Sequence, residues 1–182
     1  MAMFQPSAAE RAEATPEEQA MLDAAQRYDQ LFSGYYKLQN TRPRSIGFGL
    51  ADSPVGLAAW IYALFQDVSD SRNNPESVFS TDEMLDDIML YWLPNTGASS
   101  ARLYWEGMQE MMKGGIPSAP MLTPTGISMF PGEQVRLSRR WAERRFTKLV
   151  HCNEPSRGGH FAALEQPGLF VEEVRTAFRH LR

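Results

Sequence analysis

Two short loops hold the residues best suited to acid–base chemistry. Glu133 ends the segment Phe130-Pro131-Gly132-Glu133, and His160 ends the segment Arg157-Gly158-Gly159-His160. A carboxylate that accepts a ring N–H from histidine fixes the imidazole tautomer and stabilises the imidazolium. The other ring nitrogen can then take a proton from water. The same two residues also fit a plainer interpretation, a surface glutamate at a helix start and a histidine that caps a helix.

The chain offers no ordinary nucleophile for this pair to activate. It has no Gly-x-Ser-x-Gly segment, the pattern of a serine nucleophile elbow. Cys152 is the single cysteine and falls in a predicted strand, where a buried thiol is unreactive. One cysteine also excludes a multi-cysteine zinc site, and we expect neither metal nor cofactor. His151 is expected in the same strand, and His180 at a helix C-terminus, where the macrodipole favours it.

Two predicted strands, residues 124–129 and 148–153, lead into the two loops. A helix over residues 134–144 connects them, and a helix over residues 161–181 follows. This order predicts an α/β fold with parallel, right-handed pairing. The ends of neighbouring parallel strands lie about 5 Å apart, which would bring Glu133 to His160. Two strands are too few for a stable parallel sheet, so we expect them to belong to a larger one.

The rest of the chain is predicted to be helical. Helices are expected over residues 15–34, 53–68, 80–91 and 97–112, with loops over residues 39–51 and 69–79. Thr15 with Glu18 and Ser80 with Glu83 have the spacing of capping boxes. Residues 1–14 are small and polar, and we expect them to be disordered.

Composition places the chain among ordinary globular proteins. Its 182 residues are 43% hydrophobic and 11% aromatic, enough for a core. The 18 basic and 22 acidic residues give no electrostatic case for binding nucleic acid. The longest apolar run, residues 55–65, is too short to cross a bilayer, and the N-terminus lacks the pattern of a secretory signal. We therefore expect a cytoplasmic protein without a membrane segment.

From about residue 15 to the end, the sequence resembles the C-terminal half of epoxide hydrolases of the microsomal and juvenile-hormone type, which are α/β-hydrolases. The matching motifs occur in the same order as in the family, which makes the resemblance specific. They are Gly34-Tyr35-Tyr36-Lys37-Leu38-Gln39, Asp52-Ser53-Pro54-Val55-Gly56-Leu57-Ala58-Ala59-Trp60, Tyr91-Trp92, Ser99-Ser100-Ala101-Arg102-Leu103-Tyr104, Phe130-Pro131-Gly132-Glu133 and Arg157-Gly158-Gly159-His160-Phe161-Ala162-Ala163-Leu164-Glu165-Gln166-Pro167.

The resemblance implies a two-step hydrolysis of epoxides to diols. An aspartate opens the epoxide and forms an ester, which a histidine-activated water hydrolyses. His160 is implied as the general base and Glu133 as its acidic partner. Tyr35 and Tyr104 match the two cap tyrosines whose hydroxyls hold the epoxide oxygen, where a phenol can stabilise the developing alkoxide and donate to it. Tyr36 is expected only to pack.

The resemblance also implies which part of the fold is present. Residues 15–115 correspond to the helical cap or lid segment and following helices, and residues 116–182 to the last strands of the α/β-hydrolase core. The half that carries the nucleophile is expected to be missing, because nothing between Met1 and Thr15 resembles the family's His-Gly-x-Pro oxyanion loop or its Gly-x-Asp-x-Gly nucleophile elbow. The family pattern also gives Asp52 no nucleophilic role. We therefore predict little or no activity for this chain alone, although the family activity would suit the detoxification of epoxides.

The expected partners are a small-molecule epoxide and either a complementing N-terminal half or further copies of the chain. Two other functions remain open from the sequence. The chain could be a non-catalytic remnant that serves as an interaction module, or part of an esterase completed by another chain. Tyr35 and Tyr104 favour epoxide chemistry over ester chemistry, because ester hydrolysis needs no cap phenols.

Overall fold

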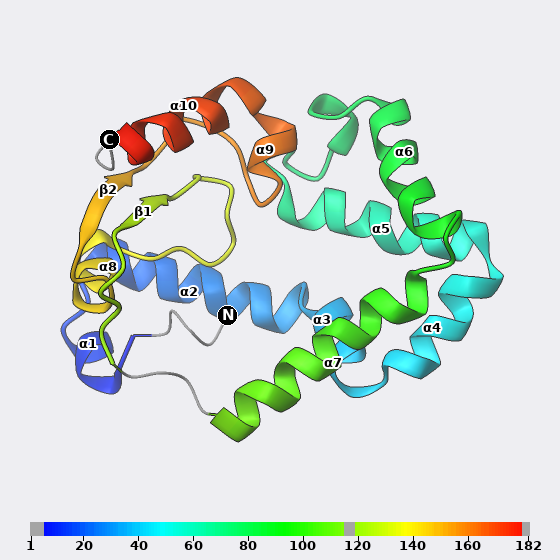
Figure 1. The fold of residues 1–182 in the computed structure, drawn as a ribbon, viewed down its shortest axis with the longest axis horizontal. Helices are drawn as coiled ribbons and strands as arrows, with labels where there is room; N and C mark the ends of the chain where they lie inside the picture. The colour runs from blue at the N-terminus through cyan, green and yellow to red at the C-terminus, as the bar shows by residue number, and fades with distance from the viewer. Residues whose placement is uncertain (1–5, 115–118, 180–182) are drawn as a thin grey trace. The chain divides into compact units, whose positions relative to one another are not determined.

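The computed structural model describes residues 6–114 and 119–179 and divides into two compact units. Unit 1 contains Met1–Asp29, Val68–Asp70 and Pro117–Arg182, and unit 2 contains Gln30–Asp67 and Ser71–Ile116. The elements are α1 (Ala8–Ala12), α2 (Pro16–Leu31), α3 (Gly34–Thr41), α4 (Pro43–Asp52), α5 (Pro54–Val68), the 3₁₀ turn η2 (Pro75–Ser77), α6 (Thr81–Trp92), α7 (Gly97–Gly114), β1 (Thr125–Ser128), α8 (Arg139–Arg145), β2 (Leu149–Asn153), α9 (Ala162–Glu165) and α10 (Pro167–Phe178) (Figure 1).

Unit 1 is built around the parallel pair β1 and β2, which confirms the predicted strands and their direction. Side chains alternate along β1 as a strand requires. Gly126 faces α10 so closely that a Cβ there would lie 2.8 Å from the Cβ of Ala177. Ile127 and Met129 pack instead against a buried cluster that surrounds α8. The cluster comprises Leu137, Trp141, Ala142 and Phe146. The sheet is therefore covered on both faces, as parallel sheets require.

Helix α2 attaches to the same core through a buried carboxylate. Glu18 is only 4% exposed, and Arg140 binds it at 2.5 Å. The hydroxyl of Ser138 donates to the same carboxylate at 2.6 Å. Leu22, one turn along α2, packs against the α8 cluster. The contacts of Glu18 with Arg140 and Ser138, together with the apolar contact of Leu22, thus hold α2 on unit 1.

The N-terminal segment differs from the expected disorder over residues 1–14. Within the described part, residues 8–12 form α1, which starts with a capping box between Ser7 and Glu10. Arg144 also bonds Glu10 at 3.0 Å. The spacing of Ser7 and Glu10 is that of a capping box, but the prediction for this segment rested on composition alone.

Unit 2 consists of helices, and α7 packs along α3 and α4 (Figure 1). The predicted loop over residues 39–51 is wrong, because α3 continues to Thr41 and α4 begins at Pro43. Proline suits the first position of a helix. A Cβ on Gly47 would lie 2.7 Å from the Cβ of Ala98 on α7, so that glycine allows close helix packing rather than a turn.

Three further predicted boundaries are wrong. Gly34 begins α3 instead of ending the preceding helix. The helix predicted over residues 134–144 is shorter, because Ser138 caps α8. The last helix is divided at Pro167 into α9 and α10, since proline cannot continue the helical hydrogen bonding. The predicted position of His180 lies outside the described residues.

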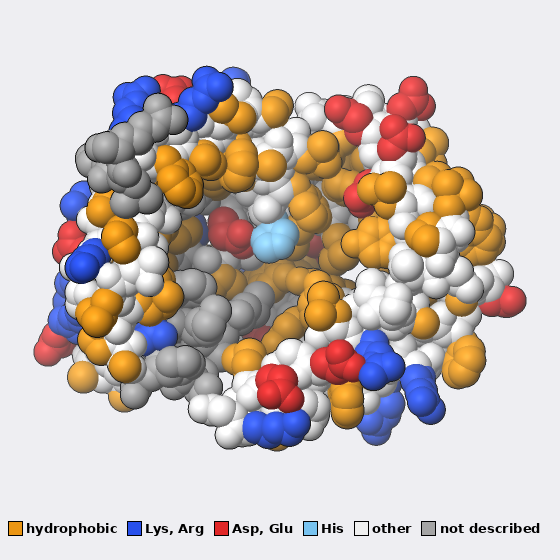
Figure 2. Space-filling model, in the orientation of Figure 1, with side chains coloured by type: hydrophobic (Ala, Val, Ile, Leu, Met, Phe, Trp, Pro, Cys, Tyr) orange, Lys and Arg blue, Asp and Glu red, His pale blue; other side chains and the backbone are white. Residues whose placement is uncertain are grey.

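The core of unit 2 lies mainly on α5 and α6. Its buried side chains are Leu50, Leu57, Ile61, Phe65, Phe79, Met84, Ile88 and Ala101. Apolar side chains also gather on the surface of α6 and at its C-terminal end, where Leu85, Met89, Leu90 and the capping residue Leu93 are exposed (Figure 2). In the part of the chain that the structure describes, no single helix could cross a membrane. Only α4 and α5 together pass the length and composition test, with a bend of 118° between them.

Candidate active site

The structure brings Glu133 and His160 together in unit 1. His160 Nδ1 lies 2.8 Å from Oε2 of Glu133. An ionised carboxylate only accepts hydrogen bonds, so Nδ1 carries the proton and donates it. Among the described residues no partner is found for Nε2, and the His160 side chain is 53% exposed. Nε2 is therefore accessible to a substrate or water, and it can accept a proton whenever the ring is neutral.

The environment favours an ion pair between these two side chains. The hydrogen bond that His160 donates to Glu133 is the main cause that raises the pKa of His160, and burial opposes it. Burial would raise the pKa of Glu133, but the hydrogen bond and charge of His160 outweigh it and lower that pKa. Such a pair stabilises the imidazolium that forms when histidine removes a proton.

The two glycines before His160 have separate steric roles. Gly158 has a φ of 108°, a conformation that L side chains rarely adopt. A Cβ on Gly159 would lie only 2.6 Å from the backbone nitrogen of Asp70, and backbone cannot yield as a flexible side chain can. The loop that presents His160 therefore needs glycine at both positions.

Glu133 and His160 border a groove of about 460 Å³ in unit 1. The groove follows β1 from Thr125 onward and is lined mostly by apolar side chains, among them Phe130, Leu137 and Phe170. Within the described chain, β1 pairs only with β2. The edge of β1 that faces away from β2 therefore carries unpaired backbone groups. The acid–base pair thus lies beside an open strand edge.

Tyr35 and Tyr104 are neighbours in unit 2. Their ring centroids lie 6.3 Å apart in an edge-to-face arrangement. Tyr36 also contacts Tyr104, at 6.0 Å. Gln39, one turn after Tyr35 on α3, is buried, and its side chain acts on Tyr104 to lower the pKa of that phenol against the net rise. The two predicted tyrosines are thus brought together from α3 and α7.

Burial is the main cause that raises the pKa of Tyr104, and the charge of Tyr35 adds to it. A phenol of ordinary pKa, about 10, is already protonated at neutral pH, and the raised pKa of Tyr104 favours the same form. The protonated hydroxyl can act as a hydrogen-bond and proton donor to an oxygen that becomes negatively charged.

Relatives of known family resemble the chain in sequence. It is 53% identical to a putative epoxide hydrolase from Stigmatella aurantiaca, over 92% of this chain and 37% of the relative. It is 39% identical to epoxide hydrolase 1 from Sus scrofa, over 79% of this chain and 33% of the relative. No protein-family model matches the chain.

Solved structures agree. Juvenile hormone epoxide hydrolase from the silkworm Bombyx mori superposes with a TM-score of 0.80 and 27% identity, over 92% of this chain and 43% of that one. The chain belongs to the epoxide hydrolases. It also matches Aspergillus niger epoxide hydrolase, with a TM-score of 0.79 and 25% identity, over 97% of this chain and 42% of that structure.

The chain spans about a third of the length of the curated epoxide hydrolases it matches. Its two parallel strands and their helices are part of an α/β-hydrolase fold. The chain is also similar in sequence to a relative of the juvenile-hormone type. It is 32% identical to juvenile hormone epoxide hydrolase 2 from Ctenocephalides felis, over 81% of this chain and 33% of that relative.

The structure also places Asp52 and Cys152, the two other residues considered as nucleophiles. Asp52 ends α4, and Ser53 rather than Asp52 caps α5 by accepting the N–H of Gly56 at 3.0 Å. Burial raises the pKa of the Cys152 thiol, which makes it a poor nucleophile. Among the described residues no cluster of three or more His, Cys, Asp or Glu side chains could hold a metal ion.

Sequence reasoning gave no role to Asp70 and Glu165, which both contact the loop of His160. Glu165 lies inside a motif used for the family resemblance, but nothing in its spacing from His160 indicates burial. Gln39 was also missed, although its spacing of four from Tyr35 places both on one face of α3.

Proposed function

We propose that this chain is part of an enzyme that hydrolyses epoxides to diols, with His160 as the general base. The hydrogen bond between His160 Nδ1 and Glu133 supports this role, because it leaves Nε2 free to accept a proton. The similarity of the chain to epoxide hydrolases supports the choice of substrate class. An activity of this kind would suit the detoxification of reactive epoxides.

The proposed reaction has two steps. A carboxylate from another part of the enzyme attacks an epoxide carbon, the C–O bond breaks, and an alkyl ester with an alkoxide forms. A tyrosine hydroxyl protonates the alkoxide. His160 then removes a proton from water, and the hydroxide attacks the ester carbonyl. The acyl C–O bond breaks, which releases the diol and regenerates the attacking carboxylate, and the imidazolium returns its proton to the tyrosinate. Glu133 stabilises the imidazolium during this second step.

Tyr35 and Tyr104 are proposed to hold the epoxide oxygen. Charge develops on that oxygen only as the ring opens, so donors aimed at it lower the barrier without stabilising the ground state equally. Both side chains are phenols, which ionise only at about pH 10 and are therefore in the protonated, donating form at neutral pH.

The attacking carboxylate is proposed to come from a complementing part of an epoxide hydrolase that pairs with β1. The open edge of β1 and the apolar groove beside it fit a further parallel strand. Such a strand would extend the sheet toward the number of members that parallel sheets normally have.

The proposal is tested by co-expressing the 182-residue polypeptide with the remaining part of the Stigmatella aurantiaca relative. The purified complex should convert styrene oxide to the diol, and the polypeptide alone should not. In His160→Gln the complex should accumulate the alkyl ester, seen by mass spectrometry, with turnover about 10²–10⁴-fold lower. Full turnover by that variant would exclude the proposed base.

The tyrosine roles are tested in the same complex. Tyr35→Phe and Tyr104→Phe should each lower kcat/KM about 10²-fold or more, because each loses a donor to the developing alkoxide. Tyr36→Phe is the matched control, since Tyr36 also contacts Tyr104 but has no proposed role. Rapid diol formation by the polypeptide alone, unchanged in Asp52→Asn, would show that no complementing part is needed.

A further inference from the structure

Glu165 is a buried carboxylate that the proposed mechanism does not use. It ends α9 and is only 7% exposed. Its Oε2 accepts the backbone N–H groups of Gly159 at 2.8 Å and Asp70 at 2.9 Å. Its Oε1 accepts the N–H of Phe161 at 2.9 Å. One side chain therefore bonds the residues directly before and after His160.

The remaining N–H groups of the His160 loop go to the segment at residues 68–70. Gly158 N–H donates to the Asp70 carboxylate at 2.9 Å, and His160 N–H donates to the carbonyl of Val68 at 3.1 Å. Each backbone N–H from residue 158 to residue 161 thus has an acceptor on Glu165 or on this segment. Glu165 also binds the segment itself through the N–H of Asp70.

A local role in capping α9 does not account for this arrangement. Capping would need only the bond to Phe161, four residues away. The bond to Asp70 spans 95 residues of sequence and fixes the loop to a different segment of unit 1. Glu165 also packs tightly against the loop, because a Cβ on Gly159 would lie only 3.0 Å from Oε1 of Glu165.

We propose that Glu165 is a positioning residue, which holds residues 158–161 so that His160 Nδ1 bonds Glu133 while Nε2 remains free for water. The inference rests on the proposed function of His160 and extends it to a residue that does not touch the substrate. The negative charge of Glu165 also raises the pKa of His160. It adds to the hydrogen bond with Glu133, which is the main cause of the rise.

Glu165→Gln tests the inference in the 182-residue polypeptide. The amide has one acceptor oxygen and directs N–H groups toward backbone donors. We expect faster amide hydrogen exchange at Gly159 and Phe161, loss of the protected His160 Nδ1–H signal and a lower His160 pKa by NMR. Glu165→Asp keeps the charge and should retain the higher His160 pKa in part. Glu172→Gln, an exposed carboxylate on α10, is the matched control.

In the co-expressed complex, Glu165→Gln should slow ester hydrolysis about 10²-fold, since a displaced base acts only in that step. Ester formation should keep its rate, whereas general destabilisation would slow both steps.

The inference stays testable if Glu165→Gln does not fold. The His160 pKa of Glu165→Asp then decides, and a value equal to that of the wild type overturns the inference. A normal His160 titration in folded Glu165→Gln also overturns it. Altered titration in a complex that never hydrolyses epoxides would overturn the proposed function alone.

Discussion

At the scale of single residues, the protonation of His160 depends on its contact with Glu133. The hydrogen bond between them is the largest cause of the raised His160 pKa. A histidine with a raised pKa stabilises the folded state below its unfolded pKa of about 6.5. That stabilisation is lost as the pH rises through the folded pKa. The neutral form of His160, which the proposed mechanism needs as a base, therefore predominates only above this raised pKa.

We predict that Glu133→Gln lowers the pKa of His160, because the amide keeps no charge to stabilise the imidazolium. The pH titration of the His160 ring by ¹H–¹⁵N NMR measures the change directly. Glu154→Gln is the control, since Glu154 pairs with Arg136 rather than with a histidine. An unchanged His160 titration in Glu133→Gln would contradict the ion pair.

A second prediction concerns the glycine that precedes His160. Gly159→Ala places a Cβ 2.6 Å from the backbone nitrogen of Asp70, so the loop must shift. We expect a loss of about 1–3 kcal/mol in the free energy of unfolding, the usual cost of overpacking. Gly168→Ala is the matched control, because no atom lies within 4 Å of its added Cβ. Urea denaturation of both variants measures the difference, and equal stabilities would refute the steric argument.

At the scale of elements, α2 is held on the core of unit 1 by Glu18. The hydrogen bond from Arg140 is the largest cause that lowers the pKa of Glu18 to about 2, against an ordinary value of 4.5. A carboxylate with a lowered pKa adds stability above its unfolded pKa. This contribution is therefore present above pH 4.5 and is lost as the pH falls toward about 2.

Glu18→Gln should destabilise unit 1 by about 2 kcal/mol at pH 7, a value reduced by the partial exposure of Arg140. The loss of stability between pH 4.5 and about 2 should be smaller in the variant than in the wild type, since the titrating group is gone. Urea denaturation followed by circular dichroism at several pH values tests both effects. Glu17→Gln, at an exposed position one residue earlier, should behave like the wild type.

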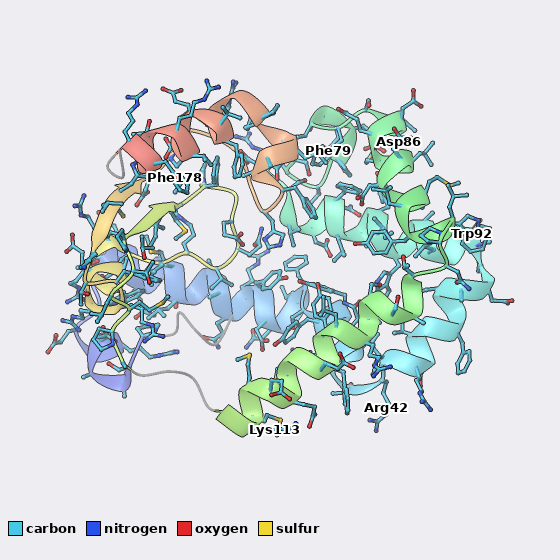
Figure 3. The ribbon with its side chains drawn as sticks, in the orientation of Figure 1. Arg42, Phe79, Asp86, Trp92, Lys113 and Phe178 are labelled. Atoms are coloured by element: carbon cyan, nitrogen blue, oxygen red, sulfur yellow. The ribbon has the colours of Figure 1, made fainter. Side chains whose placement is uncertain are left out.

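At the scale of the whole molecule, the chain leaves surfaces that a larger enzyme would cover. In the described residues the edge of β1 is unpaired, and large apolar side chains remain exposed on α6 and α10. They include Phe178 at the C-terminal end of α10 (Figure 3). Open strand edges and exposed apolar patches promote association.

We therefore expect the 182-residue polypeptide to self-associate when it is purified alone. Sedimentation velocity should show species that grow with protein concentration. Co-expression with the complementing part of the Stigmatella aurantiaca relative should replace them by a single complex, because the added strand satisfies the β1 edge. A compact monomer of the polypeptide at all concentrations would count against this prediction.

The sequence alone determined the two strands and their parallel pairing, and from these the meeting of Glu133 and His160. Each rests on local signals, such as short β-rich runs and glycine before the histidine, and on a rule that joins the ends of adjacent parallel strands. The capping box at Ser80 and Glu83 is equally local and was predicted for the same reason.

Tertiary structure alone decided the helical state of α4, the ion pair of Glu18 with Arg140 and the contacts of Glu165. The capping box of Glu18 with Thr15, in contrast, was predicted from spacing and is confirmed. Gly47 resembles a turn signal until its approach to Ala98 is known. Glu18 and Arg140 are separated by 122 residues, and Glu165 and Asp70 by 95. Burial of a carboxylate depends on which distant groups reach it, and no periodicity or spacing along a chain records that.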